Sequence, residues 1–148
     1  MNFLEIFFSS IKLILTLDPL LFEIIILSLK VSLTALIVSS FFAVIIGYIL
    51  ALKKFFLKNI LIIVFNSLMG IPPVVVGLIV YFLLARGGPL GVLQLLYTPS
   101  AMIIAQSIII FPIVVSLSHE IFSQQWLQFR DHFRAFNIPL IGTMLTLI

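Results

Sequence analysis

The main pattern along the chain is a series of three long stretches that contain no charged side chain. They run over residues 31–52, 59–85 and 101–117. At a rise of about 1.5 Å per residue, roughly 20 helical residues cross the hydrocarbon core of a bilayer. Lipid admits only helices or closed barrels, and the stretches lack the alternation of barrel strands. The pattern therefore predicts three transmembrane helices.

The segment before the first stretch has a different pattern. In residues 1–19, apolar side chains recur at helical spacing and polar ones lie opposite them. This pattern predicts an amphipathic helix in the membrane interface. A further transmembrane helix is the alternative, but Glu5 and Lys12 would be costly at depth. Pro19 ends this helix, and a new one is expected to begin near Leu20.

Residues 121–148, which follow the third stretch, are more polar. Aromatic side chains such as Trp126 and Phe129 recur at helical spacing between polar ones, and Asn137 tolerates the left-handed conformation that ends many helices. We therefore expect a short cytoplasmic amphipathic helix over residues 125–137, lying on the membrane or docked in a partner's groove. Its other candidate contact residues are Arg130, Asp131, Phe133 and Arg134.

Composition agrees with a membrane protein. Of 148 residues, 63% are hydrophobic and 9% are charged, against about 45–50% and about 25% in soluble domains. There is no cysteine, there are two histidines, and the five carboxylates are scattered. The sequence thus predicts no resident metal, no cofactor and no catalytic set, and it argues against an enzyme.

Basic residues predict the orientation. Lys53, Lys54 and Lys58 crowd the link between the first two stretches, and Arg130 and Arg134 follow the third. Cytoplasmic loops carry an excess of such residues. We therefore expect the N-terminus outside and the C-terminal segment in the cytoplasm. The opposite side carries Lys12, Lys30 and Arg86.

The second stretch contains adjacent prolines, Pro72 and Pro73, which remove backbone donors from a helix. A packing kink between helices is the common explanation. In lipid, however, a broken helix must be buried in protein or line a cavity, and the flanking Gly70 and Gly77 favour a break beside a pathway. The candidate pathway residues are Ser67, Gly70, Pro72, Pro73, Gly77 and Gln106.

Four segments together resemble a known family. They are SLKVSLTAL at 28–36, GIPPVVVGL at 70–78, GGPLG at 87–91 and YTPSAMIIAQ at 97–106. The chain resembles the membrane-spanning permease subunits of bacterial ABC-type oxyanion importers over nearly its whole length. Within them it is most similar to the tungstate permeases, with molybdate and sulfate permeases as relatives.

The resemblance implies a bacterial inner-membrane transport subunit that works with partners. These are a cytoplasmic subunit that binds and hydrolyses ATP, an extracytoplasmic substrate-binding protein and a second permease copy; nucleic acid is not among them. Residues 131–137 match the family's cytoplasmic coupling loop. This loop usually has a Glu-Ala-Ala motif and ends in glycine. Here Asp131 stands where glutamate is usual and Asn137 where glycine is usual, and neither alanine of the Glu-Ala-Ala motif is kept. The resemblance places the helix 125–137 against an ATPase groove.

Family members continue with further spans after this loop, so the resemblance implies a C-terminally truncated, partial ABC transporter domain over residues 1–148. The expected fold is all-α. It comprises an interfacial N-terminal helix, three transmembrane helices and a coupling helix, an incomplete permease core. A truncated membrane adaptor or remnant without transport activity is the alternative function.

Overall fold

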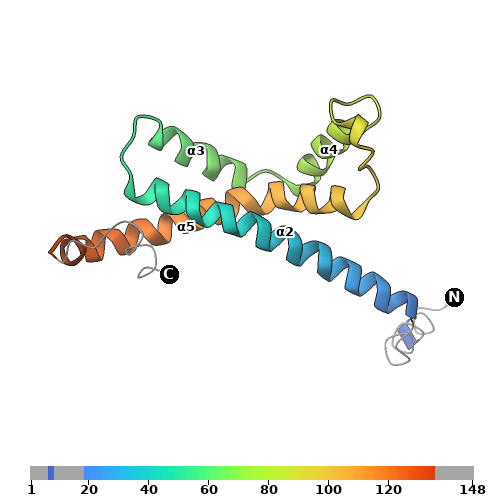
Figure 1. Cartoon of the computed structure of the whole chain (residues 1–148), viewed down its shortest axis with the longest axis horizontal. Coiled ribbons are helices and arrows are strands. Elements are labelled where there is room, and N and C mark those ends of the chain that lie inside the picture. The colour runs from blue at the N-terminus through green and yellow to red at the C-terminus, as the bar shows by residue number, and fades with distance from the viewer. Residues whose placement is uncertain (1–6, 9–18, 136–148) are drawn as a thin grey trace.

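The structure, a computed structural model, describes residues 7–8 and 19–135, with side chains as far as Phe129. All regular structure in these residues is helical (Figure 1). The predicted interfacial helix over residues 1–19 lies almost entirely outside the described residues. The elements are α2 (Pro19–Leu52), α3 (Lys58–Met69), α4 (Pro73–Leu84), the short 3-10 helix η1 (Gly91–Leu93) and α5 (Pro99–Ala135).

Helices α2 and α5 form the frame of the molecule. They cross each other, and α3 and α4 both pack against α5 (Figure 1). The link between α2 and α3 lies at the same end of the molecule as the C-terminal end of α5, whereas the link between α4 and α5 lies toward the other end (Figure 1). The two groups of basic residues that predict a cytoplasmic side, at 53–58 and in the last turns of α5, thus belong to one end.

The long helices extend beyond the uncharged stretches. Helix α2 has 34 residues and α5 has 37, lengths of about 51 and 55 Å against a hydrocarbon core of roughly 30 Å. Two segments are long and apolar enough to cross a membrane, Pro19–Leu52 and Pro99–Phe129. The prediction of an all-helical protein with apolar spans is confirmed. Helix α5 also continues without a break through the boundary expected near residue 121.

The second uncharged stretch folds as two helices instead of one. Helices α3 and α4 meet at an angle of 100° and form a bent pair, either one broken span or a re-entrant loop. With this pair the chain has up to three candidate spans within its described part.

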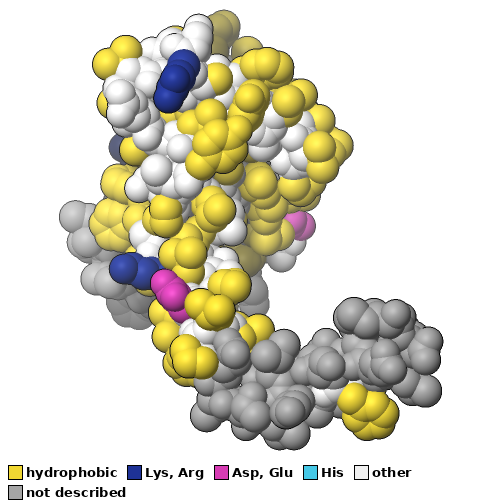
Figure 2. Space-filling view, turned by 90° about the vertical axis from the view of Figure 1, so that its right-hand side faces the viewer, with side chains coloured by type: hydrophobic (Ala, Val, Ile, Leu, Met, Phe, Trp, Pro, Cys, Tyr) yellow, Lys and Arg dark blue, Asp and Glu magenta, His cyan; other side chains and the backbone are white. Residues whose placement is uncertain are grey.

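The described surface is largely apolar. Figure 2 shows many hydrophobic side chains on one side of it, with few charged ones between them. Large side chains such as Val74 and Phe82 are exposed, whereas the buried core is small and includes Ala35, Ala43 and Val115. Such a surface is suited to lipid, because a soluble monomer rarely exposes extensive apolar area.

Small residues hold α2 against α5. Every fourth residue of α2 from position 35 to 51 is small and buried: Ala35, Ser39, Ala43, Gly47 and Ala51. Small side chains let two helix backbones approach closely, which is how helices associate in lipid. At Gly47, an added Cβ atom would lie 2.6 Å from the Cβ of Ser118 and 2.9 Å from the carbonyl oxygen of Val115. We call this contact the α2–α5 seam.

Aromatic pairs flank the seam. The rings of Tyr48 and Phe122 lie edge to face with centroids 5.4 Å apart, and those of Phe65 on α3 and Phe111 on α5 are 6.1 Å apart. Such pairs add about 0.5–1.5 kcal/mol beyond the area that they bury. They fix the position of α5 relative to its neighbours.

Candidate functional site

The break between α3 and α4 follows from local chemistry. The N–H of Gly70 donates to the carbonyl of Ser67 at 3.1 Å and closes α3 with a tight last turn. Pro72 is extended, with φ −59° and ψ 135°, and so redirects the chain. Pro73 is the first residue of α4, a position where a helix needs no N–H donor. One proline therefore ends the path of α3 and the other starts α4.

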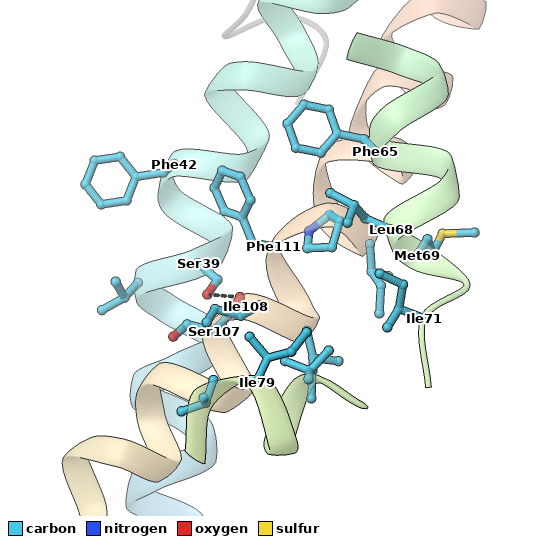
Figure 3. Close-up of a pocket in the computed structure, with 16 residues that line it drawn as sticks. Ser39, Phe42, Phe65, Leu68, Met69, Ile71, Ile79, Ser107, Ile108 and Phe111 are labelled. Carbon is cyan, nitrogen blue, oxygen red and sulfur yellow. Dashed lines mark hydrogen bonds between the residues drawn. The ribbon is translucent and has the colours of Figure 1, made fainter. Parts of the chain in front are cut away.

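A cavity of about 560 Å³ lies inside this elbow, between the bent pair and the helices α2 and α5 (Figure 3). We call it the elbow cavity. Its walls are mainly aromatic and aliphatic, with Phe65 and Phe111 among the side chains drawn in Figure 3. The polar residues in its lining are Ser39 and Ser107, and the hydroxyl of Ser39 donates to the carbonyl of Ser107 at 3.3 Å. The cavity is therefore suited to apolar contact and not to holding a charge.

The candidate pathway residues surround this cavity without lining it. Their sequence neighbours line it instead: Leu68 follows Ser67, Ile71 lies between Gly70 and Pro72, Val76 precedes Gly77 and Ser107 follows Gln106. The five candidates on the bent pair are exposed, and Gln106 is half-buried. The side-chain oxygen of Gln106 is buried without a hydrogen-bond partner in the described structure. Position in the chain thus locates the break, but not the side chains that face the cavity.

The candidate coupling residues lie toward the end of α5. Trp126 packs against the cluster of Tyr48, Ala51 and Phe122 within its own chain, while Phe129 is exposed. Arg130, Asp131, Phe133 and Arg134 belong to the last turns of α5, beyond the described side chains, and Asn137 lies outside the described residues. Part of the aromatic face predicted for a partner is therefore occupied by α2.

A second concavity, of about 500 Å³, separates α3 from the C-terminal half of α5. We call it the α3–α5 groove, and its polar lining residues are Asn66, Ser116, His119, Glu120, Ser123 and Gln124. The hydroxyl of Ser123 lies 3.3 Å from Nε2 of His119, and the amide of Gln124 donates to a carboxylate oxygen of Glu120 at 3.4 Å. The signal in the sequence is a recurrence of polar residues every three or four positions from 116 to 124, which places them on one face of α5.

Ser39 provides a test of the α2–α5 seam beside the elbow cavity. Replacing it by alanine removes its interhelical hydrogen bond, a contribution that averages about 0.6 kcal/mol in membrane proteins. We expect Ser39→Ala to lower the free energy of unfolding in detergent by about that amount. The matched control, Ser32→Ala, changes an exposed serine of the same helix and should leave this free energy unchanged. Equal effects of the two substitutions would contradict the role assigned to Ser39.

Two long crossing helices and a broken apolar pair define the described part of the chain as an all-helical protein with up to three candidate membrane spans. The chain is 41% identical over 117 residues, 79% of its length, to the tungstate uptake system permease protein TupB of Peptoclostridium acidaminophilum. It is 42% identical over 91 residues, 62% of its length, to a probable anion ABC transporter permease protein of Haloferax volcanii. It is also 33% identical over 98 residues, 64% of its length, to TupB of Campylobacter jejuni.

The chain is therefore homologous to the permease proteins of ABC-type tungstate and anion uptake systems. It spans about half the length of the curated relatives it matches, covering 51%, 39% and 40% of these three proteins. No family model matches the chain, and no solved structure matches it.

Proposed function

We propose that the chain is the membrane-spanning permease subunit of an ATP-driven importer that carries an oxyanion, tungstate in the first place, with molybdate or sulfate as the related substrates. The observation that carries this proposal is the 41% identity to a tungstate permease over most of the chain. The subunit is not an enzyme and binds no cofactor. ATP is bound and hydrolysed by a separate subunit.

Three partners belong to the proposal: a cytoplasmic ATP-binding subunit, an extracytoplasmic substrate-binding protein and a second permease copy. Support comes from the arrangement of the charges. The lysines of the link after α2 and the basic last turns of α5 lie at one end of the molecule (Figure 1). By the positive-inside rule this end faces the cytoplasm, and the N-terminal end of α2 faces outward. The protein then resides in the cytoplasmic membrane of a bacterium.

The length of α5 supports contact with an ATPase. A helix of 37 residues exceeds the hydrocarbon core by roughly 25 Å, so its last turns extend into water. The exposed Phe129 lies there, followed by the candidates at 130, 131, 133, 134 and 137. Aromatic and arginine side chains are enriched where interfaces bind most strongly. This segment is therefore the proposed docking site for the ATPase.

The pathway is proposed to pass beside the elbow of the bent pair. An irregular backbone in a membrane requires burial in protein or contact with a water-filled cavity, and most candidate residues at this elbow are exposed in the single chain. The N-terminal end of α4, which carries the positive end of the helix dipole, lies at this elbow. A helix N-terminus can bind an oxyanion without a basic side chain. A second permease copy would cover this surface.

Uptake measured in cells tests the proposal. We expect deletion of the gene to abolish accumulation of tungstate from low external concentrations, and expression of the intact gene to restore it. Molybdate and sulfate are measured in parallel to identify the preferred anion. Unchanged uptake of all three anions, in cells without a second importer, would overturn the proposal and favour the non-transporting adaptor.

A further inference from the structure

The α3–α5 groove is polar although it lies between two apolar helices. Its lining includes Asn66 of α3 and the hydroxyl groups of Ser116 and Ser123 on α5. The opposite face of α5 supplies Val115, Ser118 and other buried residues to the contact with α2. Packing against α2 therefore does not account for this polar row. In lipid, such groups are costly unless they are paired or meet water.

Ser116 presents a hydrogen-bonding group that an occupant of the groove can satisfy. Its side chain is 9% exposed, and its hydroxyl oxygen is buried without a hydrogen-bond partner in the described structure. It lies beside a space of about 500 Å³, whereas a water molecule occupies roughly 30 Å³ in the liquid and needs two to four polar partners. The groove supplies both the space and the partners, so it is suited to hold water.

The groove extends toward the end of the molecule that carries the lysine-rich link. Its α3 side runs from Met69 back to Ile62, one turn from Lys58. The amine of Lys58 donates to the carbonyl of Ala51 at 3.1 Å, which holds the start of α3 against the end of α2. Water in the groove would therefore be continuous with the side that the basic residues assign to the cytoplasm.

We propose that the α3–α5 groove is a water-filled passage through which the transported oxyanion leaves toward the cytoplasm, an inference that rests on the proposed function. The hydroxyl groups of Ser116 and Ser123 and the amide of Asn66 replace part of the hydration shell of the anion. These donors are neutral, so they bind the anion weakly. A transport pathway needs sites that the substrate can leave as well as enter.

The charged groups around the groove favour release. Glu120 is exposed at the rim, where its carboxylate accepts a hydrogen bond from Gln124 and repels an anion. The nearest basic side chain described on α3, Lys58, is held by the carbonyl of Ala51. His119 offers ring nitrogens, one of which lies 3.3 Å from the hydroxyl of Ser123. Among the described residues that line the groove there is no Lys or Arg, so the positive charge of Lys58 acts on an oxyanion from outside the lining.

Cysteine accessibility tests the inference directly, because the chain contains no cysteine. Asn66→Cys and Ser123→Cys place a thiol in the groove. The matched controls, Ile63→Cys and Ile121→Cys, place it on the exposed apolar surface of the same two helices, outside the groove lining. Each variant is studied with its native partners in inside-out membrane vesicles. A charged, membrane-impermeant thiol reagent is added on the cytoplasmic side, with and without tungstate, and tungstate uptake is measured in the same cells.

We expect the two groove thiols to react at least about tenfold faster than the controls, because a thiol in hydrocarbon ionises poorly. Tungstate should slow the reaction at positions 66 and 123 but not at 63 and 121. Should Asn66→Cys fail to accumulate, the conservative Ser123→Cys carries the test. Groove thiols as slow as the controls would overturn the inference, as would fast reaction unaffected by tungstate in cells that take up tungstate. Absence of uptake in cells with the unaltered protein would instead contradict the proposed function.

Discussion

Replacement of Gly47 by leucine is expected to prevent the stable packing of α2 on α5. A Cβ atom at this position would lie 2.6 Å from the Cβ of Ser118, 2.9 Å from the carbonyl oxygen of Val115 and 3.0 Å from the backbone nitrogen of His119. Two of these atoms belong to the backbone of α5, which cannot yield by changing a rotamer. We expect a loss of about 1–3 kcal/mol or more from overpacking, visible as a large fall in the amount of folded protein in membranes and in its melting temperature in detergent.

Gly77 provides the matched control for this substitution. It also lies within an apolar helix, but a Cβ atom there would meet nothing within 4 Å. Gly77→Leu should leave the melting temperature unchanged or raise it slightly, because leucine is also favoured over glycine in a helix, by somewhat less than about 1 kcal/mol. Only the thermal stability is compared, since Gly77 is also a candidate pathway residue. Equal stability of Gly47→Leu and the unaltered protein would show that the α2–α5 seam does not form in the membrane.

On the proposed function, the double substitution Pro72→Ala with Pro73→Ala is expected to abolish transport while leaving the protein in the membrane. With alanines, the backbone regains two N–H donors and loses the clashes of the proline rings. A single proline in a helix interior costs about 3 kcal/mol through these two effects together. Helices α3 and α4, which now meet at 100°, can then join into one straight helix. The elbow cavity depends on this bend. Tungstate uptake and the amount of protein in membranes are measured together.

The change of shape can be measured independently of transport. Spin labels on cysteines introduced at Ile60 and Phe82, both exposed in the structure, would be about 33 Å apart along a straight helix and closer together across a bend. Pro99→Ala is the control, because Pro99 is the first residue of α5, where proline is neutral. Unchanged uptake in the double variant, with a lengthened distance between the labels, would show that the elbow is not needed for transport.

The break in the bent pair could be predicted from the sequence because its cause is local. A proline lacks an N–H wherever the chain places it, so Pro72 and Pro73 interrupt a helix whatever surrounds them. The angle of 100° is not local in this sense. It depends on how Val76, Val80 and Leu84 of α4 pack toward Ala101 at the start of α5, contacts between segments that are separated in the sequence.

The ends of the long helices show a second difference. Lys30 precedes the first uncharged stretch, yet α2 runs through Lys30 and Glu23 and begins at Pro19, close to the helix start that the sequence predicts near Leu20. Glutamate and lysine are good helix formers, so a charge marks the edge of the apolar stretch and not the end of the helix. For the same reason α5 continues past His119 and Glu120 to Ala135.

Hydrophobicity and proline chemistry alone specify that this chain is helical, that it belongs in lipid and that its middle segment is broken, because each of these properties depends on neighbouring residues. The small residues of α2 at four-residue spacing are likewise present in the sequence, but their choice of α5 as a partner is not. The lining of the elbow cavity and of the α3–α5 groove depends on how each helix is rotated about its axis, and a rotation of one residue, about 100°, turns a different side chain inward. That rotation is set by the close approach at Gly47 and by the aromatic pairs beside it, contacts that exist only once the helices have packed.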